Sequence, residues 1–177
     1  MDGEFIIRGV AEADAREISA LYGHHVLHGT ASYEIEPPSE AETLAKIRRI
    51  TDPGWPFLVA ELGGDVAGYA YATQFRDRPA YRFAAENSIY IHHDLAGRGI
   101  GKALLRALVE AAASFGFRQL IAVVGGAEPA SVALHKSCGF AEVGRLRAVG
   151  FKHGRWLDTV YLQLELPAQA GNKGVTE

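Results

Sequence analysis

Hydrophobic and polar residues follow two different spacings along the chain, and together these predict an alternation of strands and helices. Apolar residues three and four positions apart indicate helices, whereas alternating or short β-branched apolar runs indicate strands. Strands are expected at residues 5–10, 32–36, 56–62, 66–74, 86–92, 118–124, 140–147 and 156–165. Helices are expected at residues 11–28, 40–50, 101–115 and 129–138.

Turn and capping residues set several of these boundaries. Ser39 is followed three residues later by Glu42, a capping-box pattern that begins the helix ending near Ile50. The run 63–65, Gly-Gly-Asp, lies between two apolar strands and is typical of a hairpin. The last two strands are expected to join in a loop around Gly150.

The helix at residues 101–115 has the clearest helical spacing. Gly116 stands just past its last residue, where glycine commonly ends a helix. Its buried face is expected to consist of Leu104, Leu108, Ala111 and Phe115.

The order of the elements predicts an α/β fold built on a mixed sheet. Hairpins precede the middle of the chain and a strand–helix–strand crossover follows it. We therefore expect a central, mostly antiparallel twisted sheet with helices on both faces, rather than a doubly wound parallel sheet. Residues 1–166 are expected to form a single domain, and the polar residues 167–177 a disordered tail.

Composition narrows the classes of function. The chain has 177 residues and a formal charge of −3, which provides no basic field for gathering nucleic acid. No apolar run approaches the roughly 18 residues of a membrane span, and the first residues lack the pattern of a secretory signal. Cys138 is the only cysteine, so an internal disulfide is impossible and a reducing, cytoplasmic location is expected.

A glycine-rich loop between an expected strand and an expected helix is a candidate anion site. It reads Gly97-Arg98-Gly99-Ile100-Gly101-Lys102. Glycines let the backbone approach phosphate oxygens, and the first amides of a helix have no intrahelical acceptor. The spacing fits neither the dinucleotide fingerprint nor the nucleotide P-loop. A turn that merely begins a helix remains an alternative for the loop taken alone.

The loop resembles the pyrophosphate-binding motif of the GNAT superfamily of N-acetyltransferases. That motif has the pattern (Arg/Gln)-x-x-Gly-x-(Gly/Ala), where x is any residue. The corresponding positions are Ala96, Gly99 and Gly101, so Ala96 departs from the pattern. Further segments resemble the phosphinothricin and methionine sulfoximine acetyltransferases, namely residues 30–34, 75–82, 86–91 and 150–158.

This resemblance covers about residues 4–166. It implies a GNAT-like acyl-CoA N-acyltransferase fold, acetyl-CoA as co-substrate, a small amino-acid-like acceptor and a homodimer. It also implies that Glu86 is the general base, directly or through a water, and that His135 donates to the thiolate, assists deprotonation or positions the reacting groups. An ion pair between Glu86 and Arg78 or Arg82, and a purely structural His135, are the alternatives.

The remaining site residues are also implied by the resemblance. The central strand would separate from its neighbour, which frees main-chain groups of Ile89, Tyr90 and Ile91 to contact the pantetheine arm. An amide near Ile89 would serve the oxyanion. Cofactor contacts are further expected from Gly97, Arg98, Gly99, Ile100, Gly101, Lys102, Glu128 and Ser137. Glu128 stands where the superfamily often has asparagine, and a carboxylate cannot offer the same donor. Clustered arginines with an aromatic residue would hold the acceptor's carboxylate, so substrate contacts are expected from Arg76, Arg78, Tyr81 and Arg82. Tyr33, Lys152 and His153 are further candidates for the substrate pocket.

Other interpretations stay open at this stage. A non-catalytic acyl-CoA-binding module, or an enzyme acting on a protein N-terminus, would share the glycine loop, whereas three arginines would repel a polyamine. The pairs His24/His28 and His92/His93 could in principle bind a metal, but neither pair has an apparent third ligand in the sequence. We therefore expect no metal cofactor.

Overall fold

The computed structural model describes residues 4–167, and within this range the chain forms seven strands and four α-helices. The last ten residues of the expected tail, 168–177, lie outside the described residues. In chain order the elements are β1 Phe5–Gly9, α1 Ala15–His28, α2 Glu40–Thr51, β2 Phe57–Leu62, β3 Asp65–Gln74, β4 Ala84–Ile91, α3 Ile100–Phe115, β5 Gln119–Gly125, α4 Pro129–Ser137, β6 Ala141–Lys152 and β7 Arg155–Glu165.

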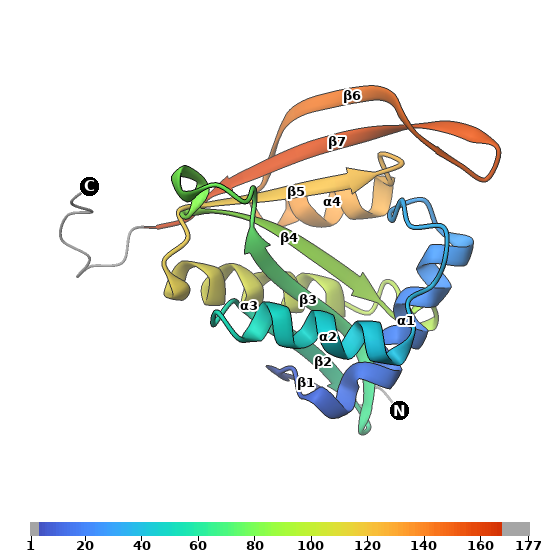
Figure 1. Cartoon of the computed structure of the whole chain (residues 1–177), viewed down its shortest axis with the longest axis vertical. Helices are drawn as coiled ribbons and strands as arrows, with labels where there is room; N and C mark the ends of the chain where they lie inside the picture. The colour runs from blue at the N-terminus through green and yellow to red at the C-terminus, as the bar shows by residue number, and fades with distance from the viewer. Residues whose placement is uncertain (1–3, 168–177) are drawn as a thin grey trace.

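The seven strands form one mixed sheet in the order β1-β2-β3-β4-β5-β7-β6. The pair β4–β5 is parallel and is joined by the α3 crossover, while the other neighbouring pairs are antiparallel. Helices α1 and α2 pack together over β2 and β3, and α3 covers the opposite face, with α4 beside it under β5 and β7 (Figure 1). The expected mixed sheet with helices on both faces is confirmed.

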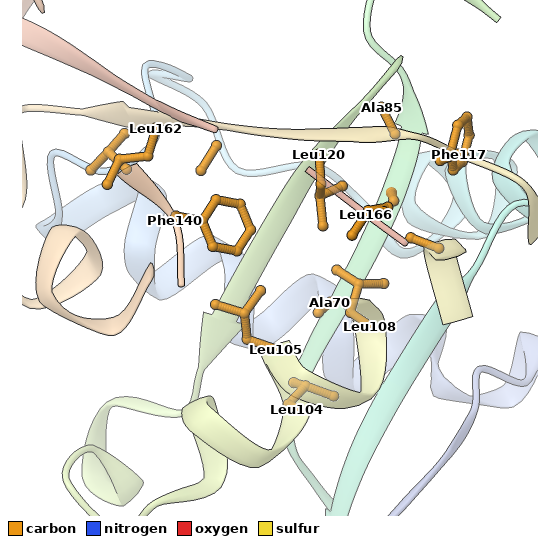
Figure 2. Close-up of a cluster of buried hydrophobic side chains, with 14 of the residues drawn as sticks. Ala70, Ala85, Leu104, Leu105, Leu108, Phe117, Leu120, Phe140, Leu162 and Leu166 are labelled. Carbon is orange, nitrogen blue, oxygen red and sulfur yellow. The ribbon is translucent and has the colours of Figure 1, made fainter. Parts of the chain in front are cut away.

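The larger apolar core lies between α3 and the sheet. Leu104, Leu105 and Leu108 are fully buried there and pack against small and large apolar residues of the strands (Figure 2). The expected face was wrong at its end, because Phe115 is 43% exposed and Ala112, rather than the half-buried Ala111, is fully buried. Gly116 ends the helix with a φ of 114°, and Phe117 after this turn takes the buried position instead.

The segment expected as a strand at residues 32–36 is not a strand. Side chains from distant elements satisfy its polar groups in place of a neighbouring strand. The Ser32 hydroxyl pairs with the Tyr22 hydroxyl at 2.6 Å, and Lys152 Nζ donates to the Ser32 carbonyl at 2.7 Å. The two prolines that follow, Pro37 and Pro38, have no amide hydrogen to donate to a sheet.

The turn between the last two strands also differs from the expectation. Gly150 lies within β6, and the chain reverses at His153 and Gly154, which both have positive φ as a tight hairpin turn requires. Glycine is needed at position 150 for a different reason. A Cβ there would stand 2.6 Å from the Tyr33 ring, so the ring and the strand approach one another too closely for any side chain.

Other expected boundaries are confirmed. The Glu42 amide donates to Ser39 Oγ at 3.2 Å and the Ser39 amide donates to Glu42 Oε2 at 2.8 Å, which completes the capping box of α2. Among the described residues, none of the helices combines the length and the apolar character that crossing a membrane would need.

Candidate active site

Strands β4 and β5 separate part-way along their length. Their parallel pairing joins Ala84–Asn87 to Gln119–Ala122 and goes no further. Beyond that point β4 continues to pair with β3 as far as Ile91, while β5 continues to pair with β7. In the part of the chain that the structure describes, the main chain of residues 88–91 therefore has a strand neighbour on one side only, as the resemblance implied.

A cavity of about 610 Å³ opens where the strands part. Its lining brings together most of the residues expected to contact the cofactor: Ile89, Tyr90, Ile91, Gly97, Gly99, Gly101, Lys102, Glu128 and Ser137. Arg98 and Ile100 are not part of this lining. The Ile100 side chain is 2% exposed and belongs to the α3 core, so only its main chain is available to a ligand.

The glycine loop ends at the first turn of α3. Gly97 and Gly99 have φ of 81° and 80°, a conformation that side chains with a Cβ rarely adopt. The Ala103 amide donates to the Gly99 carbonyl, so the amides of residues 100–102 precede the first helical hydrogen bond. These amides and the positive end of the helix dipole form a site for an anion.

Glu86 stands on β4 on the face opposite to α4. Successive side chains of a strand point to opposite faces, and the neighbouring Asn87 contacts His135 of α4. Burial raises the pKa of Glu86, and the positive charge of Arg76 opposes this more weakly. Within residues 4–167 no ion pair joins Glu86 to Arg78 or Arg82, which removes the main support for its alternative role.

Comparison with known proteins places this geometry in a family. Residues 7–161 match the family model described as an acetyltransferase (GNAT) domain. The chain belongs to the GNAT acetyltransferase family.

Two curated relatives illustrate the range of similar proteins. A phosphinothricin N-acetyltransferase from Alcaligenes faecalis is 46% identical over 172 residues, covering 97% of this chain and 86% of the relative. An L-methionine sulfoximine/L-methionine sulfone acetyltransferase from Salmonella typhimurium is 35% identical, covering 93% and 96%.

The solved structures extend this similarity to the fold. A GNAT superfamily phosphinothricin acetyltransferase from Sinorhizobium meliloti, solved in complex with AcCoA, has a TM-score of 0.92 and 49% identity, covering 98% of this chain and 94% of that one. The structure of yncA, described as a putative acetyltransferase from Salmonella typhimurium with its cofactor acetyl-CoA, has a TM-score of 0.90 and 34% identity, covering 94% and 96%.

His135 of this GNAT domain is buried, with both ring nitrogens engaged. Nδ1 donates to the Ser131 carbonyl at 2.8 Å, which leaves Nε2 as the acceptor for the Asn87 amide group at 2.9 Å. Burial lowers the pKa of the imidazole, in keeping with a neutral ring. Of the expected roles, these contacts favour positioning over proton donation. His135 and Glu86 also lie on opposite faces of β4.

Asn87 is a site residue that sequence reasoning missed. The residue is 5% exposed, and its buried Oδ1 has no hydrogen-bond partner among residues 4–167. It lines a small cavity of about 40 Å³ at the point where β4 and β5 separate, together with Ile89 and His135. A free acceptor here suits an N–H donor of a ligand or a water molecule. The available signal was a polar side chain in the middle of an expected central strand.

The loop of residues 75–83, which carries Arg76, Arg78 and Arg82, lies at the end of β4 that carries Glu86. Arg76 stacks over Phe75 at 4.1 Å and is the arginine whose charge acts on the pKa of Glu86. Arg82 stacks over Phe83 at 4.6 Å, and all three arginines and Tyr81 are exposed. Of the three exposed arginines, only Arg76 acts on the pKa of the expected base.

Two residues expected in the substrate pocket have structural contacts instead. The Tyr33 hydroxyl donates to the Asp158 carbonyl at 2.9 Å, pairs with Thr159 Oγ1 at 2.7 Å and accepts from the Gly126 amide at 3.2 Å. Lys152 is 5% exposed, and burial lowers its pKa while Nζ donates to a main-chain carbonyl. Both tie the segment after α1 to the last hairpin, so a substrate would compete with these hydrogen bonds for their polar atoms.

A second cavity, of about 540 Å³, opens on the α1 and α2 side of the sheet. Tyr22 and Tyr69 line it together with Lys46, whose ammonium group stands over the Tyr22 ring at 5.2 Å. Tyr69 pairs in register with Tyr90 of β4, so this cavity lies on the same face of the sheet as Glu86. Sequence reasoning gave no sign of it, because its walls come from four separate elements, α1, α2, β2 and β3, and from the loop between the two helices.

Proposed function

We propose that this GNAT domain transfers the acetyl group of acetyl-CoA directly to the amine of a small amino-acid-like acid of the phosphinothricin, methionine sulfoximine or methionine sulfone type. The observation that carries the proposal is the separation of β4 from β5 after Asn87. The cavity at this separation extends to the glycine loop, and Glu86 stands on β4 just before the strands separate. The names of the relatives support the class of acceptor.

The cofactor would lie along the open edge of β4. Its pyrophosphate would accept hydrogen bonds from the amides of residues 100–102, with Arg98 and Lys102 adding positive charge. The absence of a long side chain at Ala96 leaves these amides unchanged. Ser137 Oγ already donates to the Leu134 carbonyl, so Ser137 would serve the cofactor as an acceptor.

Acetyl transfer needs a neutral amine, because an ammonium group has no free electron pair. Glu86 would take the proton, directly or through a water, as the amine nitrogen bonds to the thioester carbon. The negative charge on the carbonyl oxygen would be stabilised by an amide near Ile89. Collapse of the tetrahedral intermediate then breaks the carbon–sulfur bond, and CoA leaves as a thiolate that takes up a proton. His135 would act as a positioning residue by holding Asn87 at the separation of the strands.

The direct test is an acetyl-CoA consumption assay across amino acids, phosphinothricin, methionine sulfoximine and methionine sulfone. We expect stoichiometric release of CoA with at least one acid of the last three. Tight acetyl-CoA binding without turnover of any amine would identify a non-catalytic module instead. Turnover confined to peptides with a free N-terminus would move the acceptor to a protein.

Replacing Arg78 by alanine should raise the Michaelis constant of the acceptor about tenfold. A charged hydrogen bond to a carboxylate contributes about 1.5 kcal/mol or more, which corresponds to that factor. Steady-state kinetics with each substrate varied in turn measure the effect. Arg106→Ala, on the exposed side of α3, is the matched control. A change confined to the Michaelis constant of acetyl-CoA would contradict the proposed contact between Arg78 and the carboxylate of the acceptor.

We also propose that two chains associate through the β6–β7 hairpin. The strand β6 is an edge of the sheet, and residues 141–149 are exposed on both faces. The hairpin also exposes large apolar residues: Val143, Leu146, Val149, Phe151 and Trp156. Contiguous exposed apolar surface of this kind is typical of interfaces.

Trp156→Glu should convert the dimer into a monomer, because Trp156 is 67% exposed in the single chain and a carboxylate is costly to bury. Size-exclusion chromatography with light scattering measures the mass. Ile6→Glu is the control, since Ile6 is a comparably exposed apolar residue on β1, the other edge strand. A monomeric wild-type chain at all concentrations would refute the interface.

We further propose that residues 1–166 form one catalytic domain and that the protein acts in the cytoplasm. All seven strands of the described chain share one sheet, which supports a single domain. Cys138 carries a free thiol, which suits a reducing compartment.

A further inference from the structure

Four histidine rings gather where the end of α1 meets the turn after β4. Helix α1 contributes His24 and His28, and the turn contributes His92 and His93. The His24 ring is stacked on His93, with centroids 3.7 Å apart and an angle of 7° between the planes. His28 lies 4.7 Å from His24, and His92 lies 4.4 Å from His93. The fold therefore joins two histidine pairs that are far apart in the sequence.

A carboxylate completes the cluster on the exposed side. Asp94 Oδ2 lies 3.5 Å from His93 Nε2 and 4.0 Å from His92 Nδ1, and one ligand atom from each of these three residues lies within 4.8 Å of the others. A zinc ion binds imidazole nitrogen and carboxylate oxygen at about 2.0–2.2 Å, so ligand atoms around one ion stand roughly 3–4 Å apart. His92 Nδ1 accepts a hydrogen bond from the Asp94 amide at 3.3 Å, so an ion bound at this nitrogen would replace that hydrogen bond.

We propose that His92, His93 and Asp94 form an accessory binding site for a divalent transition-metal ion of the zinc class, with His24 stacked behind His93. Two imidazoles and one carboxylate suit zinc, nickel or copper, whereas magnesium and calcium prefer oxygen ligands alone. Water would complete the coordination. Asp94 supplies the third ligand that neither histidine pair offers by itself.

The site lies at the rim of the cofactor cavity. His93 lines the cavity, and residues 92–94 connect the open edge of β4 to the glycine loop. The neighbouring His25 is excluded from the ligand set, because its Nε2 donates to the Ile91 carbonyl at 2.8 Å. The ion has no part in the proposed acetyl transfer, in which Glu86 removes the proton, and the two proposals can therefore fail independently.

Isothermal titration of the full chain, freed of any histidine tag, with zinc chloride tests the site. We expect one zinc ion per chain, with binding weakened at least tenfold by His93→Asn and by Asp94→Asn. Cobalt is a second probe, because its visible absorption bands report coordination by nitrogen and oxygen ligands, and those bands should be lost in the same variants. Circular dichroism verifies that each variant is folded.

His153→Asn is the matched control. His153 is an exposed histidine in the β6–β7 turn with a φ of 50°, a conformation that asparagine tolerates. This variant should bind zinc like the wild type. Wild-type binding well below one ion per chain, or unchanged binding by His93→Asn, would overturn the proposal. If His28→Asn abolished zinc binding while the variants of His93 and Asp94 retained it, the ion would belong to His24 and His28 on α1, and the proposal would also be overturned.

Discussion

Glu86→Gln is expected to lower the turnover number by about 10²- to 10⁴-fold while leaving acetyl-CoA affinity nearly unchanged. A positioned general base contributes rate factors of this size, and glutamine keeps the shape of the side chain without its basicity. Steady-state kinetics near pH 7, together with a calorimetric dissociation constant for acetyl-CoA, measure both quantities. Glu110→Gln is the matched control, because Glu110 is exposed on the far side of α3. Equal turnover of Glu86→Gln and wild type would refute the assignment.

The pH dependence provides a second check on the same residue. Burial raises the pKa of Glu86, so the carboxylate that can accept a proton forms only as the pH rises through this raised value. Activity should therefore increase with pH on the acidic limb of the profile. Arg76 lowers the pKa of Glu86. Arg76→Ala removes that effect and should shift the acidic limb to higher pH, whereas Arg106→Ala should leave it in place.

As the pH rises, the contribution of Glu86 to folding stability should fall while the activity rises. A carboxyl group whose pKa is raised on folding stabilises the protein only while it is protonated, and the stability declines as the pH rises through the raised value. At neutral pH the neutral glutamine of Glu86→Gln should therefore be no less stable than the wild type. Thermal unfolding would separate a loss of catalysis from a loss of folding.

The parts of the fold that the sequence predicted are those that depend on residues close together along the chain. The capping box at Ser39 and the glycine that ends α3 each act within a few positions, and both appear as expected. The separation of β4 from β5 was implied by family resemblance and by no local pattern. Asn87 escaped notice because its partner, His135, is 48 residues away.

Two residues of the candidate site have contacts that the sequence could not reveal for the same reason. Tyr33 and Lys152 are polar residues in segments that resemble a known family, so a substrate role was a reasonable expectation. Their actual partners, Asp158 and Ser32, lie 125 and 120 residues away along the chain. Hydrogen bonds over such separations are decided by packing, and one sequence without coordinates carries no sign of them.

The glycine loop gives the second large expected effect. Gly99→Val should weaken acetyl-CoA binding tenfold or more. Gly99 has a φ of 80°, and an L-residue in this left-handed region costs about 1–2 kcal/mol, with a β-branched side chain at the unfavourable end. The loop can relieve this strain by moving. The amides of residues 100–102 would then lose alignment with the pyrophosphate, and each charged hydrogen bond contributes about 1.5–3 kcal/mol.

Gly101→Ala separates this effect from a general sensitivity of the loop. Gly101 lies inside the first turn of α3, where alanine favours the helix by about 1 kcal/mol over glycine. A Cβ there would stand 3.4 Å from Leu134 Cδ2 and 3.5 Å from Ile91 Cγ1, which are ordinary contacts. We expect acetyl-CoA affinity within about twofold of the wild type, a change of roughly 0.4 kcal/mol. If titration calorimetry found both variants equally weakened, crowding of the loop would explain the loss better than the left-handed geometry at Gly99. If neither were weakened, the amides at the start of α3 would not hold the pyrophosphate.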